Sequence, residues 1–170
     1  RLSLVGSEMC IRDRLNMIAH NVMTRYPDIK VVVPHAASFL PYAIPRLRGG
    51  YPLLLKKGLT ELIDIDENLA RLYYDFAGAT SPQAVKMMLT ITTPDHILYG
   101  SDYPFVPVPI LQKVVGKVKI EIANDPELCR YADAFFRENA LRLFGEETSG
   151  TKESICQPVI KEAMQPDGIV

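Results

Sequence analysis

The chain has 170 residues, and its 19 basic and 20 acidic side chains are interspersed, for a formal net charge of −1. This balance gives no electrostatic basis for binding nucleic acid or an anionic membrane, and no apolar run approaches the ~20 residues of a membrane-spanning helix. The three cysteines lie far apart without CxxC spacing, so the sequence predicts neither a disulfide framework nor a structural zinc site, and a reducing cytoplasm is the default compartment.

The first residues are foreign in character. The segment from Leu4 to Arg14 resembles one reading-frame translation of a transposon-based sequencing adapter. It has no basic start, no adequate apolar core and no small-residue cleavage site, so it is not a signal peptide. We therefore expect residues 1–14 to be a sequencing-adapter artefact and the natural sequence to begin near Leu15, with its true upstream part lost.

Helical and strand patterns alternate between residues 15 and 145. Apolar residues at helical spacing predict the helices, whereas short runs rich in β-branched or aromatic residues predict strands. In chain order, we expect a helix at 15–24, a strand at 29–33, a helix at 39–48, a moderately helical stretch at 53–63, a polar connector at 64–68, a strand at 72–76, a helix after Ser81-Pro82, a strand at 97–100, and helices at 110–122 and 132–144.

Local signals place several element ends. Gly49-Gly50 is expected to break the helix before it. Ser81 can cap the next helix because its side chain accepts a backbone N–H, and Pro82 fits the first turn, where its missing N–H costs nothing. Gly145 is expected to stop the last helix. Residues 146–170 are polar and lack periodicity, which predicts a flexible C-terminal tail.

This alternation predicts βαβ units and a parallel α/β sheet of three strands. Two of the predicted strands lead directly into side chains that can do chemistry. His35 follows the strand at 29–33, and Asp102 follows the strand at 97–100 within the stretch GSDYPF. Ligands bind at the carboxyl ends of strands in parallel folds. The pattern therefore indicates a metal or acid/base site.

Several segments carry a family resemblance in a fixed order. They are Arg25 to His35, Leu40 to Arg46, Tyr74 to Gly78, Asp95 to Phe105 and Asn139 to Gly145. Together they resemble the C-terminal half of the amidohydrolase-related family, which includes 2-amino-3-carboxymuconate-6-semialdehyde decarboxylase and the resorcylate-type decarboxylases. The resemblance covers residues 15–145, and the ordered combination is far more specific than any one motif.

The resemblance implies a (β/α)8 TIM barrel with a divalent metal, Zn²⁺ or Mn²⁺, at its mouth. By motif, Asp102 takes the place of the family's aspartate ligand, which can also move a proton, and His35 that of its catalytic histidine. The family's HxH pair and third histidine ligand have no match here. A barrel needs at least ~200 residues, so the chain is expected to supply the last three βα units of a truncated barrel and to hold a metal poorly.

For the intact parent protein, the resemblance implies a metal-dependent enzyme acting on a small carboxylated or cyclic substrate. The reaction is non-oxidative decarboxylation or hydrolysis, and the resemblance leans toward the decarboxylases. An alternative is a catalytically silent fragment or an α/β interaction module without a complete metal site; another is a metal-free α/β binding protein. Family members often associate, which implies a homo-oligomer, although nothing in the sequence places an interface.

Other polar residues leave alternatives open. Arg46 either meets a substrate carboxylate through bidentate hydrogen bonds or is an ordinary surface arginine. Tyr103 either forms part of the substrate pocket or simply packs. Asp75 either lines a pocket or is hydrogen-bonded in a structural role. His96 precedes its strand, on the face where barrels keep stability, so a structural role is predicted, and His20 is expected at a helix surface.

Overall fold

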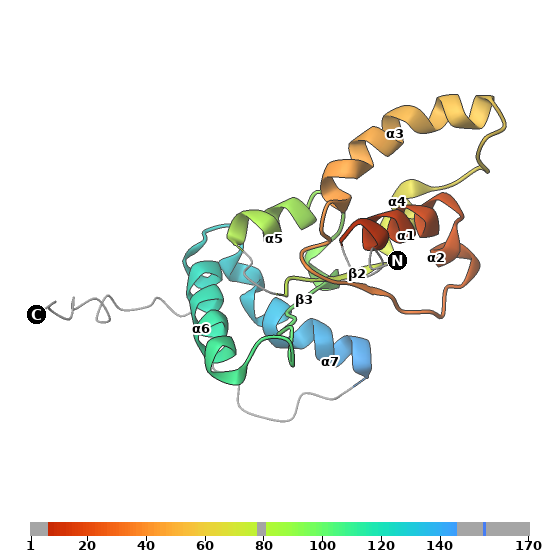
Figure 1. Ribbon diagram of the computed structural model, residues 1–170. Coiled ribbons are helices and arrows are strands. Elements are labelled where there is room, and N and C mark those ends of the chain that lie inside the picture. Colours follow the sequence, from red (N-terminus) through yellow and green to blue (C-terminus); the bar gives the residue numbers. More distant parts are fainter. Residues whose placement is uncertain (1–6, 78–80, 146–154, 156–170) are drawn as a thin grey trace, which may run out of the picture.

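The computed structural model describes residues 7–77, 81–145 and 155 (Figure 1). Its helices and strands are α1 (Ser7–Ala19), α2 (Val22–Arg25), β1 (Val32–Val33), α3 (Leu40–Lys56), α4 (Ile65–Ala70), β2 (Tyr73–Asp75), α5 (Pro82–Met88), β3 (Ile97–Leu98), α6 (Val108–Asn124) and α7 (Asn139–Phe144). Two short 3-10 segments (Pro94–His96, Cys129–Tyr131) and a π-helical turn (Ala134–Glu138) complete the description.

The sheet confirms the predicted parallel arrangement. The strands lie in the order β1-β2-β3, and both neighbouring pairs are parallel. Tyr74 is the central residue, with Val33 as its partner on one side and Ile97 on the other. All three strands are shorter than predicted, because the ladder covers only the residues that face one another across the sheet.

An aromatic cluster packs the final helical segment against the sheet. The Phe76 ring makes edge-to-face contacts with the rings of Tyr99, Phe135 and Phe136 at 5.5, 6.1 and 5.6 Å between centroids. Such pairs add stability beyond the area they bury. Tyr74 is fully buried beside this cluster, and its burial raises the pKa of its hydroxyl. The hydroxyl therefore stays protonated and donates to the Leu69 carbonyl over 2.9 Å.

The prediction that Gly49-Gly50 ends a helix is wrong. α3 runs through both glycines to Lys56 and projects from the rest of the molecule in Figure 1. Glycine lowers helix propensity, but it ends a helix only where the backbone takes a left-handed conformation. That conformation occurs later, at Gly58, where φ is +66°.

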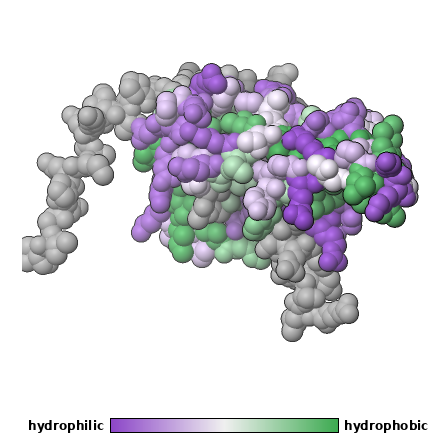
Figure 2. Space-filling view, turned by 90° about the horizontal axis from the view of Figure 1, so that it is seen from above, coloured by the Kyte–Doolittle hydropathy of each residue, from purple (hydrophilic) through white to green (hydrophobic). Residues whose placement is uncertain are grey.

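The C-terminal part of α3 exposes apolar side chains at the molecular surface. Only Leu40, Pro41 and Ile44 of this helix are buried. Leu53, Leu54, Leu59 and Leu62, on the end of α3 and the segment after it, are all exposed. In Figure 2, apolar residues gather at the right-hand end of the molecule, the side toward which α3 projects in Figure 1.

The polar connector expected at 64–68 is a helix instead. Asp64 caps α4, because its side chain accepts the N–H of Glu67 over 2.9 Å. Asp66 and Glu67 lie in the first turn, where negative charge interacts favourably with the helix dipole. The acidic residues that suggested a loop are therefore helix-start signals.

Two predicted helices are divided in the structure. Asn21, with φ at +52°, separates α1 from α2 within the helix predicted at 15–24, and a π-helical turn occupies part of the helix predicted at 132–144.

Two other helix boundaries follow their signals. Ser81 caps α5 and accepts the N–H of Ala84, with Pro82 in the first turn, as predicted. Gly145 ends α7 with φ at +73°, as predicted. Within the described ranges, no helix combines the length and the apolar character needed to cross a bilayer.

The artefact predicted at 1–14 and the tail predicted at 146–170 stay predictions. α1 runs without interruption across position 14, and Arg14 is almost buried and donates to Ser38 Oγ over 3.0 Å. Of the expected tail, residues 146–170, all but Ile155 lie outside the described residues. The N–H of Ile155 donates to Asp133 Oδ1 over 2.8 Å.

Cys129 is disulfide-bonded, which the cysteine spacing did not predict.

Candidate functional site

The carboxyl edge of the sheet brings three polar residues together. β1 leads through Pro34 into His35, β2 ends at Asp75, and β3 leads into Asp102. Because the strands are parallel and adjacent, all three residues lie at one edge. Neighbouring strands are ~4.8 Å apart, so β1 and β3 lie about 10 Å apart, with β2, which ends at Asp75, between them. The placement of His35 and Asp102 at strand ends agrees with the expectation, and their chemical roles stay predictions.

The turn that carries His35 has an unusual backbone. The four consecutive residues His35–Ser38 all have left-handed φ angles, between +51° and +59°. None of them is glycine, and each such residue costs roughly 1–2 kcal/mol. The Ser38 N–H donates to the His35 carbonyl over 2.8 Å, which closes the turn. A conformation of this cost persists only where its surroundings hold it.

Asp75 accepts several of the hydrogen bonds that keep this turn in its conformation. Its Oδ1 accepts the backbone N–H of His35 and that of Ala77, both over 2.9 Å. Its own carbonyl accepts the N–H of Ala36 over 2.7 Å. The structural reading of this aspartate is therefore confirmed, and its contacts connect the end of β2 to the turn that follows β1.

Gly100, just after β3, lies directly against the same carboxylate. A Cβ at this position would meet Asp75 Cγ and Ala77 Cβ, each at 3.0 Å, and Asp75 Oδ2 at 3.1 Å. A side chain there would be in tight contact, and the Asp75 carboxylate and Ala77 would have to shift by a few tenths of an ångström to admit it. Packing, rather than a left-handed backbone, therefore favours glycine at this position.

This contact gives a stability prediction. Gly100→Ala is expected to destabilise the fold by about 1–3 kcal/mol, because the added methyl group overlaps the Asp75 carboxylate. Gly116→Ala is the matched control, since nothing lies within 4 Å of its Cβ position in α6. There alanine should stabilise by about 0.5–1 kcal/mol through helix propensity. Urea unfolding of both variants measures the difference, and equal stabilities would contradict the packing argument.

Asp102 lies in a tight turn after β3. It is half-buried, and its φ is +60°. Its carbonyl accepts the N–H of Val106 over 3.1 Å, and Ser101 Oγ accepts the N–H of Tyr103 over 3.2 Å. Tyr103 and Phe105 are both largely exposed. The turn therefore presents one carboxylate and two aromatic rings at the edge.

A mainly apolar cavity of about 520 Å³ opens beside His35. It is lined by His35, Ala36, Ser38, Phe39, Pro41, Tyr42, Ala84 and Met87. Mainly apolar walls with a few polar groups, here His35, Ser38 and Tyr42, are typical of sites for small organic ligands. Arg46 is exposed on α3 and, like Tyr103, does not line this cavity, so their predicted contacts with substrate stay predictions.

The described residues do not form a complete metal site. No three of their His, Cys, Asp or Glu side chains are grouped so that they could hold a metal ion. Asp102 offers a hard carboxylate of the kind that Zn²⁺ and Mn²⁺ accept, but one carboxylate does not hold either ion against water. A metal at Asp102 would need further ligands from outside the described residues.

The two other histidines have structural contacts. The His96 ring stacks on Tyr73 at 4.4 Å, and its Nδ1 lies 2.9 Å from the Leu72 carbonyl. Both contacts are at the amino end of the sheet, which confirms the predicted structural role. His20 is exposed at the end of α1, with its Nδ1 2.8 Å from the Asn16 carbonyl.

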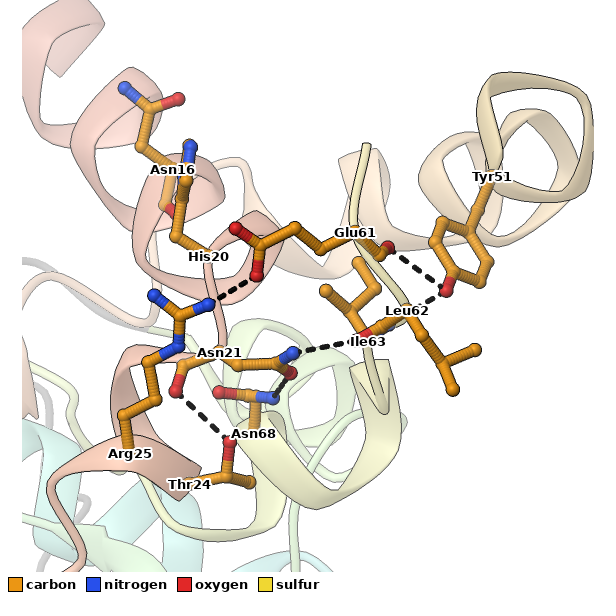
Figure 3. A network of polar contacts seen from close by, with 10 residues as sticks. All are labelled: Asn16, His20, Asn21, Thr24, Arg25, Tyr51, Glu61, Leu62, Ile63 and Asn68. Atoms are coloured by element: carbon orange, nitrogen blue, oxygen red, sulfur yellow. Dashed lines mark hydrogen bonds and ion pairs between the residues drawn. The ribbon is translucent and has the colours of Figure 1, made fainter. Parts of the chain in front are cut away.

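A second cavity, of about 620 Å³, lies beside a polar network drawn in Figure 3, and Asn21, Tyr51 and Ile63 of that network are among its lining residues. Asn21 donates to the Leu62 carbonyl over 2.8 Å and accepts from Asn68 over 3.0 Å. The Tyr51 hydroxyl accepts the Ile63 N–H over 2.7 Å, and Arg25 forms an ion pair with Glu61. These groups bind one another, so the network fastens the segment before α4 to α2 and α3.

Comparison with known proteins shows which family and fold this architecture resembles. The family model described as amidohydrolase matches residues 3–145. A crystal structure described as amidohydrolase II superposes with a TM-score of 0.66 at 28% identity, covering 81% of this chain and 42% of that one. A manganese-bound 5-carboxyvanillate decarboxylase from Novosphingobium aromaticivorans superposes with a TM-score of 0.62 at 20% identity, covering 77% and 37%. These matches imply a TIM-barrel-type α/β fold, of which the described residues show three adjacent strands.

A relative found by sequence comparison is a decarboxylase as well. The 6-methylsalicylic acid decarboxylase of Penicillium expansum is 28% identical over 96 residues, which is 56% of this chain and 30% of that protein. The chain thus spans about a third of the length of this curated relative. The family match extends over most of the chain, from before α1 to the end of α7. The chain belongs to the amidohydrolase family.

Proposed function

We propose that the full protein is a metal-dependent decarboxylase that removes the carboxylate from a small aromatic acid. The relatives by sequence and by structure include decarboxylases of 6-methylsalicylic acid and of 5-carboxyvanillate, the latter with bound manganese. The observation that carries the proposal in this chain is the apolar cavity that His35 lines. Asp102 does not line this cavity, and it follows β3, which is parallel to the strand that leads to His35. An aromatic ring matches apolar walls of this kind.

The residues of the chain have separate parts in this proposal. Phe39, Tyr42 and Met87 would contact the apolar face of the ring. His35 would hold or deliver the proton that replaces the lost carboxylate, because an imidazole can both donate and accept a proton. Asp102 would be one metal ligand, completed by ligands from outside the described residues.

We further propose that the 170-residue chain is catalytically silent by itself. Its described residues supply no grouped metal ligands. Calorimetric titration of the chain with Mn²⁺ or Zn²⁺ should therefore give no measurable stoichiometric binding. Tight one-to-one binding would contradict this proposal.

The decarboxylase proposal is tested on the full protein. Sequencing the native locus at and upstream of the codon for Leu15 tests whether the protein has further residues there, among which the proposal expects an HxH pair and a further strand-end histidine. The purified protein is then incubated with Mn²⁺ and either 6-methylsalicylate or 5-carboxyvanillate, and released CO₂ is measured together with the phenolic product by chromatography. Stoichiometric CO₂ and product support the proposal.

A hydrolase remains the competing function, because the matching family model is described as amidohydrolase. The same preparation is therefore assayed with small cyclic amides by following ring opening. Amide hydrolysis without CO₂ release from either acid would replace decarboxylation with hydrolysis. An upstream sequence without the histidines would remove the metal-dependent proposal altogether.

A further inference from the structure

We infer that Asp75 is a positioning residue for the site of the proposed function. Its carboxylate fastens the turn of His35 and abuts the turn that leads to Asp102, and so sets the position of one relative to the other. The inference rests on the proposed function for its catalytic consequence. Its structural part stands on contacts within this chain and is testable without activity.

The first contact set fixes the His35 turn. Three backbone N–H groups, those of His35, Ala36 and Ala77, donate to Asp75, two to Oδ1 and one to its carbonyl. The His35 side chain is exposed, whereas Ala37 is buried in the core and Ser38 accepts from Arg14, so these contacts restrain the middle and the end of the left-handed turn. The hydrogen bonds to Asp75 provide that restraint at the residue where the turn begins.

The second contact is with the segment that follows β3. Asp75 is the last residue of the central strand, and Leu98 of β3 is its register partner. Two residues beyond Leu98, the Cα of Gly100 lies so close that an added Cβ would be 3.0 Å from Asp75 Cγ. One carboxylate is therefore in contact with the segments that follow both β1 and β3.

The contacts also explain the residue type. An apolar side chain of this size would leave the N–H groups of His35 and Ala77 without their acceptor, and a longer acid would overlap Gly100. Asparagine keeps the size and the Oδ1 acceptor while it removes the charge. Asp75→Asn should therefore retain the positioning that Asp75→Ala loses.

Backbone amide hydrogen exchange measures the positioning directly in the 170-residue chain. In Asp75→Ala, exchange at His35 and Ala77 is expected to rise by about tenfold, because each amide loses its acceptor. In Asp75→Asn, both rates should stay within about twofold of the wild type. Asp64→Ala is the matched control: it removes an equivalent bond to Glu67 and should raise exchange there but not at His35.

Gly100→Ala keeps the inference testable if Asp75→Ala fails to fold. The added methyl group displaces the carboxylate, so the same two amides should exchange faster, whereas Gly116→Ala should leave both unchanged. Unchanged exchange at His35 and Ala77 in folded Asp75→Ala, or in Gly100→Ala, would overturn the inference.

The catalytic consequence is measured in the full protein. Misplacement of a reacting group by about 1 Å can cost about 100-fold in rate, so Asp75→Ala should lower kcat by about 10- to 100-fold with KM nearly unchanged. Asp75→Asn should restore most of kcat. Equal losses in both variants, or a loss confined to KM, would overturn the positioning role. A wild-type protein without decarboxylase activity would instead defeat the proposed function, while the exchange data would still decide the contacts of Asp75.

Discussion

In the full protein, His35→Asn is expected to lower kcat for decarboxylation by about 10²- to 10⁴-fold, the usual loss when a positioned proton donor is removed. His35 follows β1 at the carboxyl edge and lines the apolar cavity. Asparagine can still form a hydrogen bond there, but it cannot exchange a proton near neutral pH. The measurement is the initial rate of CO₂ release from the acid that the wild type decarboxylates.

The matched control is His20→Gln. His20 is exposed at the end of α1 and does not line the cavity at His35, so its replacement should leave the rate within about twofold. Thermal unfolding of both variants separates a catalytic loss from a folding loss. A His35→Asn protein that is folded and fully active would remove His35 from the proposed chemistry.

The sequence was most informative where one local pattern decides the structure. The start of α5 at Ser81-Pro82 and the end of α7 at Gly145 each depend on a few neighbouring atoms, and both were predicted correctly. Parallel pairing followed from alternation of elements, and it placed His35 and Asp102 at one edge. These signals are local or periodic, so a single sequence contains them.

The features that the sequence did not predict depend on contacts between segments far apart in the chain. The left-handed turn at His35–Ser38 contains no glycine, so no residue type announced it. The role of Asp75 depends on the N–H of His35, 40 positions away, and on the close approach of its carboxylate to Gly100, which has no side chain. A signal for Asp75 was present in its place at the end of the central strand, but its hydrogen-bond partners could not be identified from that place alone.

The end of α3 was missed for a different reason. Gly49-Gly50 has the composition of a helix end, but the geometry that ends a helix is the left-handed residue, which lies at Gly58. Asp64 was similarly read as part of a connector, although its side chain caps α4. In both cases the residue types were informative, and their interpretation depended on backbone angles that the sequence does not state.

Asn139→Ala is expected to lower the free energy of unfolding by about 2–4 kcal/mol, one of the largest losses available to a single substitution here. Asn139 is almost fully buried at the start of α7. Its Nδ2 donates to the Pro94 carbonyl over 2.8 Å and to the Ile97 carbonyl over 2.7 Å. One side chain thus joins the last helix to the beginning of β3, and alanine would leave both carbonyls without this donor.

Two further variants make the Asn139 result specific. Asn139→Asp keeps the size but sets a carboxylate oxygen against two carbonyl oxygens, so it should destabilise at least as much as alanine. Asn124→Ala, at the exposed end of α6, should change stability by no more than about 0.5 kcal/mol. Urea unfolding followed by circular dichroism gives all three values. If Asn139→Ala matched Asn124→Ala, the two hydrogen bonds would not hold α7 to the sheet, and another contact, such as the Phe76–Phe135 ring pair, would have to do so.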